Sequence, residues 1–298
     1  MNDQGALRDL GWDSTWAETL ERLPAAAGLP PVRITAVHRG RVQVLGEGLD
    51  LLAPVAGTLG LQPAVGDWGV HDGRRVSAIL PRRTVLARED AVLAANVDLG
   101  AIVAACHEEI DLPRLERFLA LVAVGGIEPL VILSKGDLCT DPGAEADRVR
   151  ERLGVEAMAV SVWGGWGLET IRERFHRGRT AVLVGMSGVG KSTLLNSLLG
   201  EERQRTAPVR ERDGAGRHAT VHRELFTLPN GALLVDTPGM RRPPLADAEG
   251  VAGAFADIEE LARSCRFSDC RHEDEPGCAV RGVVSPERLE SMRELERE

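Results

Sequence analysis

The feature that most constrains this chain is a glycine-rich segment that lies between an apolar run and a helical pattern. It reads Gly185-Met186-Ser187-Gly188-Val189-Gly190-Lys191-Ser192, follows the apolar residues 181–184 and precedes a helical stretch beginning at Thr193. In such a strand, loop and helix the glycines let backbone N–H groups turn toward phosphates, and the helix N-terminus adds its positive end. We expect Lys191 to reach the β- and γ-phosphates and the Ser192 hydroxyl to ligate Mg²⁺, with the rest of the loop and Thr193 around the phosphates.

The positions of the two lysines also indicate a nucleotide-binding site. Of the 36 basic residues only Lys135 and Lys191 are lysines, and Lys135 lies in Ser134-Lys135-Gly136-Asp137 after an apolar run. The Asp137 carboxylate can accept hydrogen bonds from both guanine N1–H and the 2-amino group, whereas adenine offers no matching pair of donors. The motif therefore favours GTP over ATP, with the Lys135 stem along the base. Ser161, which follows another apolar run, is expected to complete base recognition through its backbone.

Two further segments fit a nucleotide hydrolase. Asp236-Thr237-Pro238-Gly239 follows an apolar strand, so we expect Asp236 to hold Mg²⁺ through water and the Gly239 N–H to sense the γ-phosphate. Residues 214–221 are rich in glycine and charge, as a switch segment should be, and Thr220 is the candidate Mg²⁺ ligand there. His218 is a candidate catalytic residue, and an exposed histidine without a function is the alternative.

The order of the motifs predicts an unusual connectivity. Short apolar runs alternate with amphipathic segments from Val85 to about Pro244, which predicts a mostly parallel sheet covered on both faces. In ordinary GTPases the base motif follows the phosphate motifs, but here Lys135 and Asp137 precede the phosphate loop and no lysine follows Lys191. The sequence therefore predicts a circularly permuted GTPase domain over residues 84–244, a multidomain α/β protein overall.

A cysteine cluster follows this domain. Cys265, Cys270, His272 and Cys278 form the spacing C-x4-C-x-H-x5-C. Three thiolates and an imidazole packed this densely predict a closed tetrahedral site for one structural Zn²⁺, and buried cysteines without a metal are the alternative. Cys106 and Cys139 lie in or just after strands and are expected to be core thiols.

The remaining segments complete the predicted organisation. Residues 1–30 show an approximate helical pattern, which we interpret as an extension packed on its own protein, a partner-binding helix being the alternative. Residues 31–83 carry short β-type runs that predict an OB-type barrel. Residues 245–298 predict a helical zinc-binding domain. Six arginines could line an RNA-binding surface on the barrel or be solvated surface residues: Arg39, Arg41, Arg74, Arg75, Arg82 and Arg83.

Composition narrows the class of protein. Hydrophobic residues make up 43% and charged residues 27%, as in ordinary soluble proteins. The net charge of -9 argues against a protein that coats nucleic acid through bulk positive charge. Without a run of roughly 18 apolar residues or a secretory signal, we expect a cytoplasmic monomer that has no membrane partner and no disulfides.

Taken together, these motifs resemble the ribosome small subunit-dependent GTPase A family over nearly the whole chain. The segments that carry the resemblance, besides the phosphate and base motifs, are Ala95-Asn96-Val97-Asp98, Gly216-Arg217-His218-Ala219-Thr220, Phe267-Ser268-Asp269-Cys270 and Glu275-Pro276-Gly277-Cys278-Ala279-Val280. The resemblance implies an OB-fold, a circularly permuted GTPase and a zinc domain that act in late maturation of the small ribosomal subunit. It implies ribosomal RNA as a partner, hydrolysis of GTP to GDP stimulated by that subunit, and His218 as the residue that positions the attacking water.

Three departures from the family pattern accompany the resemblance. The usual Asn of the base motif is Ser134, which removes an amide that helps to hold the loop. Ala219 and Val221 replace two switch threonines, leaving Thr220 as the Mg²⁺ candidate in that run. The third departure is the overall acidity, which requires local basic surfaces for RNA binding.

We expect GTP-Mg²⁺ to order residues 214–221 and 236–240 and so fix the barrel and zinc domains for binding RNA, until hydrolysis releases the particle. Met240 stands where a catalytic glutamine could follow Gly239, so intrinsic hydrolysis should be slow. One alternative is a zinc-containing RNA-binding module with nucleotide as a structural ligand. Another, an ATP-using metallochaperone, is disfavoured by Asp137.

Overall fold

The computed structural model describes residues 5–57, 59–88, 91–106, 109–200, 223–237 and 255–297. Its centre is a parallel sheet with the order β10-β9-β8-β11-β13. The strands are β8 (Leu99–Ala105), β9 (Glu128–Ser134), β10 (Ala157–Ala159), β11 (Thr180–Val184) and β13 (Leu233–Asp236). Their apolar runs are continuous because both faces of the sheet are covered.

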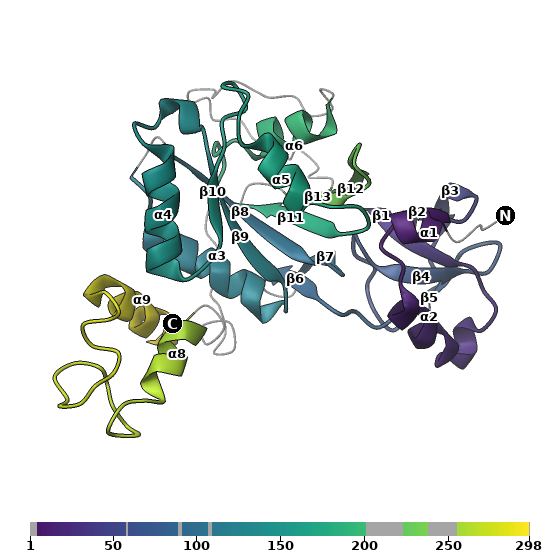
Figure 1. Ribbon diagram of the computed structural model, residues 1–298. Coiled ribbons are helices and arrows are strands. Elements are labelled where there is room, and N and C mark those ends of the chain that lie inside the picture. Colours follow the sequence, from purple (N-terminus) through teal and green to yellow (C-terminus); the bar gives the residue numbers. More distant parts are fainter. Residues whose placement is uncertain are drawn as a thin grey trace, which may run out of the picture.

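Helices cover the two faces of this sheet in pairs. On one face lie α3 (Leu112–Val124) and α4 (Pro142–Leu153), and on the other lie α5 (Leu168–Arg174) and α6 (Lys191–Leu199), as Figure 1 shows. Alternate residues of each strand feed two separate cores: Val131 and Val182 pack with the α3 and α4 side, while Ile132 and Leu183 pack with the α5 and α6 side. The expected mostly parallel, doubly covered sheet is confirmed.

The N-terminal β region forms a small closed set of five strands. These are β1 (Pro31–His38), β2 (Arg41–Gly46), β3 (Leu49–Pro54), β4 (Trp68–His71) and β5 (Val76–Ile79). Strand β1 pairs with β2 and β4, β2 pairs with β3, and β4 pairs with β5, all antiparallel. A parallel bridge between Val55 and Val76 closes the ring, and Val32, Ile34 and Val42 are fully buried inside it. A separate hairpin of β6 (Val85–Arg88) and β7 (Ala91–Ala95) follows.

The five-stranded ring and the parallel sheet are joined by a strand that the sequence patterns did not indicate. Strand β12 (Glu224–Thr227) runs antiparallel to β13 and also pairs with β1, with Ala36 opposite Glu224. All described strands except the β6–β7 hairpin therefore belong to one continuous sheet of 11 strands that crosses the expected domain boundary.

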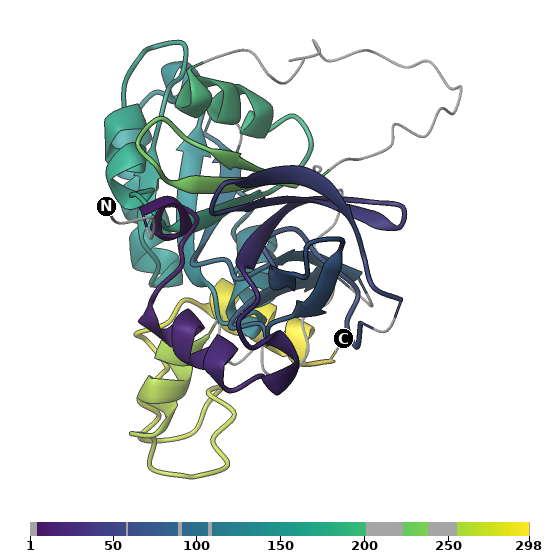
Figure 2. The same cartoon turned by 90° about the vertical axis from the view of Figure 1, so that its right-hand side faces the viewer.

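The N-terminal extension is helical and packs on its own protein. It consists of α1 (Gly5–Asp9), α2 (Ser14–Glu21) and the 3-10 turn η1 (Pro24–Ala26), rather than one helix. Leu7 and Trp16 are buried, and the Trp12 and Trp68 rings meet edge to face with their centroids 4.7 Å apart. Figure 2 shows these helices lying along the barrel and reaching toward the parallel sheet.

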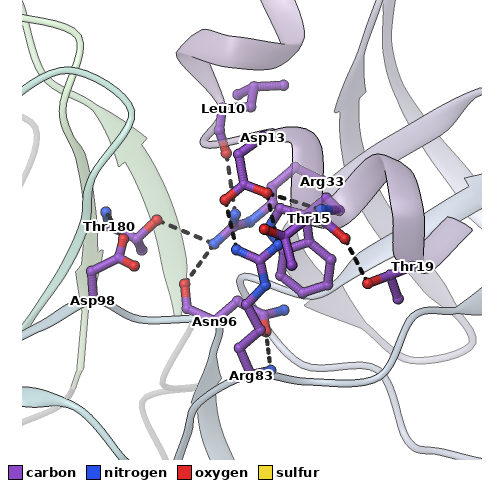
Figure 3. Close-up of polar contacts among 10 residues, drawn as sticks. Leu10, Asp13, Thr15, Thr19, Arg33, Arg83, Asn96, Asp98 and Thr180 are labelled. Carbon is purple, nitrogen blue, oxygen red and sulfur yellow. Dashed lines mark hydrogen bonds and ion pairs between the residues drawn. The ribbon is translucent and has the colours of Figure 1, made fainter.

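A buried arginine connects the extension, the barrel and the sheet. Arg33 on β1 is only 2% exposed and donates to the carbonyls of Leu10 (3.1 Å) and Asn96 (2.9 Å) and to Thr180 Oγ1 (3.2 Å), as Figure 3 shows. Its guanidinium lies 5.0 Å from the Trp68 ring centroid. Burial lowers the pKa of Arg33 to about 10, although nearby carboxylates counteract part of that shift. Arg33 therefore remains charged at neutral pH.

The C-terminal region carries a small core of its own. Helices α8 (Ala256–Ala262) and α9 (Pro286–Arg297) lie below α3 and α4 in Figure 1. Buried Arg288 on α9 forms a two-pronged ion pair with Asp257 (2.5 and 2.8 Å), and its Nε lies 3.4 Å from the buried carboxylate of Glu116 on α3. This arginine thus ties the C-terminal region to the helices that cover the parallel sheet.

The barrel arginines fall into two groups. Arg82 pairs with buried Asp67 at 2.7 Å, and Arg83 forms two 2.7 Å bonds with Asp13 and lies over the Trp16 ring. These ion pairs hold the fold together, and an RNA-binding role for the two arginines stays a prediction. Arg75 pairs with its neighbour Asp72. Five of the six are exposed, namely Arg39, Arg41, Arg74, Arg75 and Arg83, and Arg82 is half-buried.

Among the described residues, no helix combines the length and the apolar character that crossing a bilayer would require.

Candidate functional site

The predicted nucleotide motifs meet at one edge of the parallel sheet. Residues 185–190 follow β11, residues 134–137 lie at the end of β9, Ser161 follows β10, and Asp236 ends β13. These are the carboxyl ends of adjacent strands, which is where open α/β sheets bind ligands. Asp236 pairs in register with Leu183, so its carboxylate stands beside the start of the phosphate loop.

The phosphate loop has the backbone that its glycines allow. Gly185, Gly188 and Gly190 have φ values of 143°, 84° and 95°, which residues with a Cβ rarely adopt. A Cβ at Gly185 would lie 2.4 Å from the carbonyl oxygen of Val103. The chain turns immediately into α6, so the loop is continuous with a helix N-terminus.

Lys191 is held at the centre of this loop. Its side chain is buried, and Nζ donates to the carbonyl oxygens of Gly185 (2.9 Å) and Met186 (2.7 Å). Burial lowers the pKa of the ammonium to about 8, and the Asp236 carboxylate counteracts part of that shift. A desolvated cation beside a glycine loop and a helix N-terminus is a chemical environment that fits a polyphosphate. Ser192 and Thr193 follow, both half-buried, on the first turn of α6.

The base-recognition segment approaches the phosphate loop through Ser134. The Ser134 hydroxyl lies within hydrogen-bonding reach of the carbonyl oxygens of Val189, in the phosphate loop, and Ala104. The serine therefore ties the two motifs together, although the amide of the family pattern is absent. Lys135 adopts a left-handed conformation with φ 56°, which costs a non-glycine residue roughly 1 kcal/mol. Asp137 is exposed at the end of this turn, in η2 (Gly136–Leu138).

Ser161 is held by its backbone and contacts Asp137 through its side chain. Its N–H donates to the carbonyl of Trp166 (3.1 Å), and its own carbonyl accepts from the Trp166 N–H (3.1 Å), while the expected backbone role in base recognition stays a prediction. The Ser161 hydroxyl is buried, accepts from the N–H of Gly164 (2.7 Å) and donates to Asp137 Oδ1. The sequence patterns did not indicate this contact, because it joins loops that follow different strands.

The four predicted zinc ligands come together in the C-terminal region. The ligand atoms of Cys265, Cys270, His272 and Cys278 all lie within 4.8 Å of one another. His272 Nδ1 is 3.5 Å from Cys278 Sγ and 3.7 Å from Cys265 Sγ. Bonds of about 2.3 Å to sulfur and 2.0 Å to nitrogen give such separations around a tetrahedral ion. The donor set and its spacing therefore fit Zn²⁺.

The backbone around this cluster suits thiolate ligands. The N–H of Ala279 donates to Cys265 Sγ and that of Arg281 to Cys278 Sγ, both at 3.3 Å. His272 has a left-handed φ of 60°, and the Glu275 carboxylate accepts from the N–H groups on either side of it, those of Arg271 and Glu273, at 2.9 Å each. These bonds lower the pKa of Glu275 to about 2. The loop is thus shaped to present the imidazole.

Three predicted site residues lie outside the described part of the chain: His218, Thr220 and Gly239. Thr237, which precedes the last of these, is buried and donates to the carbonyl of Leu183 at 2.6 Å. A cavity of about 1230 Å³ lies elsewhere, between α8, α9 and the α4 side of the sheet, with Arg152, Asp257 and Arg288 in its lining. Because it lies away from the phosphate loop, it is not the nucleotide site.

Comparisons with known proteins all point to one family of GTPases. The family model described as RsgA GTPase matches residues 79–246. A Streptomyces coelicolor protein named small ribosomal subunit biogenesis GTPase RsgA is 43% identical, with 100% of this chain and 87% of that protein covered. A relative of the same name from Xylella fastidiosa is 47% identical over 76% of this chain and 72% of its own length.

Two solved structures have a similar fold. YloQ, described as a circularly permuted GTPase, matches with a TM-score of 0.67 and 26% identity, covering 92% of this chain and 96% of its own. YjeQ from Thermotoga maritima matches with a TM-score of 0.67 and 24% identity over 89% of this chain and 96% of its own. The permuted motif order read from the sequence thus has a counterpart in a known fold.

Proposed function

Because the chain belongs to the RsgA GTPase family, we propose that it hydrolyses GTP to GDP and phosphate during biogenesis of the small ribosomal subunit. The observation that carries this function is the buried ammonium of Lys191 beside a glycine loop, a helix N-terminus and the Asp236 carboxylate. When bound, GTP-Mg²⁺ supplies the scissile phosphoanhydride bond and the metal charge.

Each nucleotide-site residue within the described ranges has a proposed role. Residues 185–193 surround the phosphates, with Lys191 on the β- and γ-phosphates and Ser192 on Mg²⁺. Asp236 orients a water of the ion. Asp137 accepts from the guanine N1–H and 2-amino groups, Ser161 holds that carboxylate, Lys135 lies along the base and Ser134 keeps the base loop against the phosphate loop.

Three tasks fall on residues outside the described ranges. We assign Mg²⁺ coordination to Thr220, γ-phosphate sensing to the Gly239 N–H and positioning of the attacking water to His218. Ordering of residues 214–221 and 236–240 by GTP would then change how the barrel and the C-terminal region meet their partner.

The domain assignment is part of the proposal. Residues 31–83 form an OB-type barrel, 84–244 the permuted GTPase domain and 245–298 the zinc domain, preceded by the extension of residues 1–30. Support for the barrel comes from the pairing of its five strands and the Val55–Val76 bridge. One Zn²⁺ on the Cys3His cluster would hold the C-terminal loop. Ribosomal RNA would meet the exposed arginines Arg39, Arg41 and Arg74, and the protein would act as a cytoplasmic monomer.

Phosphate release from GTP by the purified protein, with and without small ribosomal subunits, tests this function. We expect slow release alone, faster release with subunits, and none from Lys191→Ala. His218→Ala should lose the stimulation while GDP affinity is unchanged. Tight GTP binding without any phosphate release, even with subunits present, would instead favour a zinc-containing RNA-binding module in which the nucleotide is structural.

A further inference from the structure

We propose that Trp166 is a positioning residue for guanine selectivity, because its indole braces the turn that carries Asp137. The inference rests on the proposed function, in which Asp137 reads the base. It concerns a side chain that lies in the loop between β10 and α5.

The indole fills room that two glycines leave open. A Cβ at Gly136 would lie 2.4 Å from Trp166 Cη2 and 2.8 Å from Cζ2, and one at Gly164 would lie 2.7 Å from Trp166 Nε1. Contacts below 3.0 Å cannot be accommodated without a shift of the ring or the loop. The ring therefore lies between the base-recognition turn and its own loop, in direct contact with the residue before Asp137.

The same loop also holds the Asp137 carboxylate by hydrogen bonds. Trp166 and Ser161 exchange two backbone bonds of 3.1 Å, the Gly164 N–H donates to Ser161 Oγ, and the Ser161 hydroxyl donates to Asp137 Oδ1. Because a serine hydroxyl has a single proton, the accepted bond from Gly164 leaves that proton for the carboxylate. The indole thus fixes the spacing between the loop that supplies this bond and the turn that receives it.

Such bracing matters because Asp137 is exposed and its turn is strained at Lys135, with φ 56°. A carboxylate that must accept two parallel N–H bonds from guanine needs a fixed direction. Loosening the turn should therefore weaken recognition of the guanine 2-amino group more than binding of the phosphates, which depends on Lys191.

Calorimetric binding of GDP and inosine diphosphate tests this idea, since inosine keeps N1–H but lacks the 2-amino group. The wild-type protein should prefer GDP by about tenfold, the effect of one hydrogen bond to a charged group. Trp166→Ala should reduce that preference to about twofold or less. The matched control is Trp163→Ala in the same loop, because the Trp163 side chain is 85% exposed, and it should keep the wild-type preference.

A second variant, at Gly136, distinguishes loss of the indole contact from misfolding of Trp166→Ala. Gly136→Ala pushes a methyl group into the indole and should also reduce the preference, but much less so in a Trp166→Ala background, where no ring is present to meet it. If Trp166→Ala weakens both nucleotides equally, or if either single variant keeps the wild-type preference, the inference is wrong while guanine recognition stands. If the wild-type protein itself shows no preference, the proposed role of Asp137 fails, and this inference fails with it.

Discussion

Replacing Arg33 by methionine should destabilise the junction of the N-terminal extension, the barrel and the sheet by about 3 kcal/mol. The side chain makes three hydrogen bonds from a charged donor, each worth about 1.5–3 kcal/mol. Against them stands the cost of burying the charge: a pKa lowered from 12.5 to about 10 corresponds to roughly 3 kcal/mol. Methionine is unbranched and uncharged, ends near the position of the arginine Nε, and leaves the Leu10, Asn96 and Thr180 oxygens without their donor.

Urea unfolding followed by tryptophan fluorescence is the suitable assay, because Trp12, Trp16 and Trp68 cluster at this junction. With a denaturant slope of about 1–3 kcal/mol per molar, the midpoint should fall by about 1–3 M. The control is exposed Arg41 on β2, whose replacement by methionine should change stability by less than about 0.5 kcal/mol. A loss below about 1 kcal/mol for Arg33→Met would show that burial of the guanidinium cancels its hydrogen bonds, contrary to this reasoning.

Three further predictions concern other parts of the molecule. The hydrogen bonds from Arg83 lower the pKa of Asp13 below its usual 3.8. The resulting stabilisation is fully present above pH 3.8 and is lost as the pH falls further and the carboxylate is protonated. The urea midpoint of the wild-type protein should therefore drop between about pH 5 and pH 3 more than that of Asp13→Asn. One equivalent of zinc should be found by elemental analysis, and a chelator or Cys270→Ser should make residues 255–297 protease-sensitive, because their buried core is small; resistance after metal removal would contradict this. Ser134→Ala should weaken GDP binding by about two- to tenfold through loss of the contact to Val189, and unchanged affinity in calorimetry would refute that role.

The parts of the fold that could be predicted from sequence are those with a strong local pattern. Continuous apolar runs predicted the parallel strands, and the amphipathic segments between them predicted covering helices such as α3. Strands β3 and β12 lack a continuous apolar run. Exposed and less exposed residues alternate along β3, and only two residues of β12 are buried. Short strands such as these are defined by the strands they pair with, which a single sequence does not reveal.

For the candidate site, too, sequence spacing predicted some features and missed others. Spacing alone indicated that the cysteine cluster would gather, and its four ligand atoms do lie together. The tasks assigned to the nucleotide-site residues stay predictions. By contrast, Arg33 looked like an ordinary polar position on a strand, yet its partners Asn96 and Thr180 lie 63 and 147 residues further along. Contacts of that range depend on how the elements pack, so a local pattern cannot reveal them.

The pairing of β12 with β1 has a mechanical consequence for any cycle of binding and release. Strand β12 has the Asp236 strand on one side and the barrel on the other, so main-chain bonds join the two halves directly. A free hinge between them would have to break those bonds. We therefore expect a change of the parallel sheet on nucleotide binding to bend the barrel together with the sheet. Rotation of the barrel as a rigid body about a flexible linker is not expected.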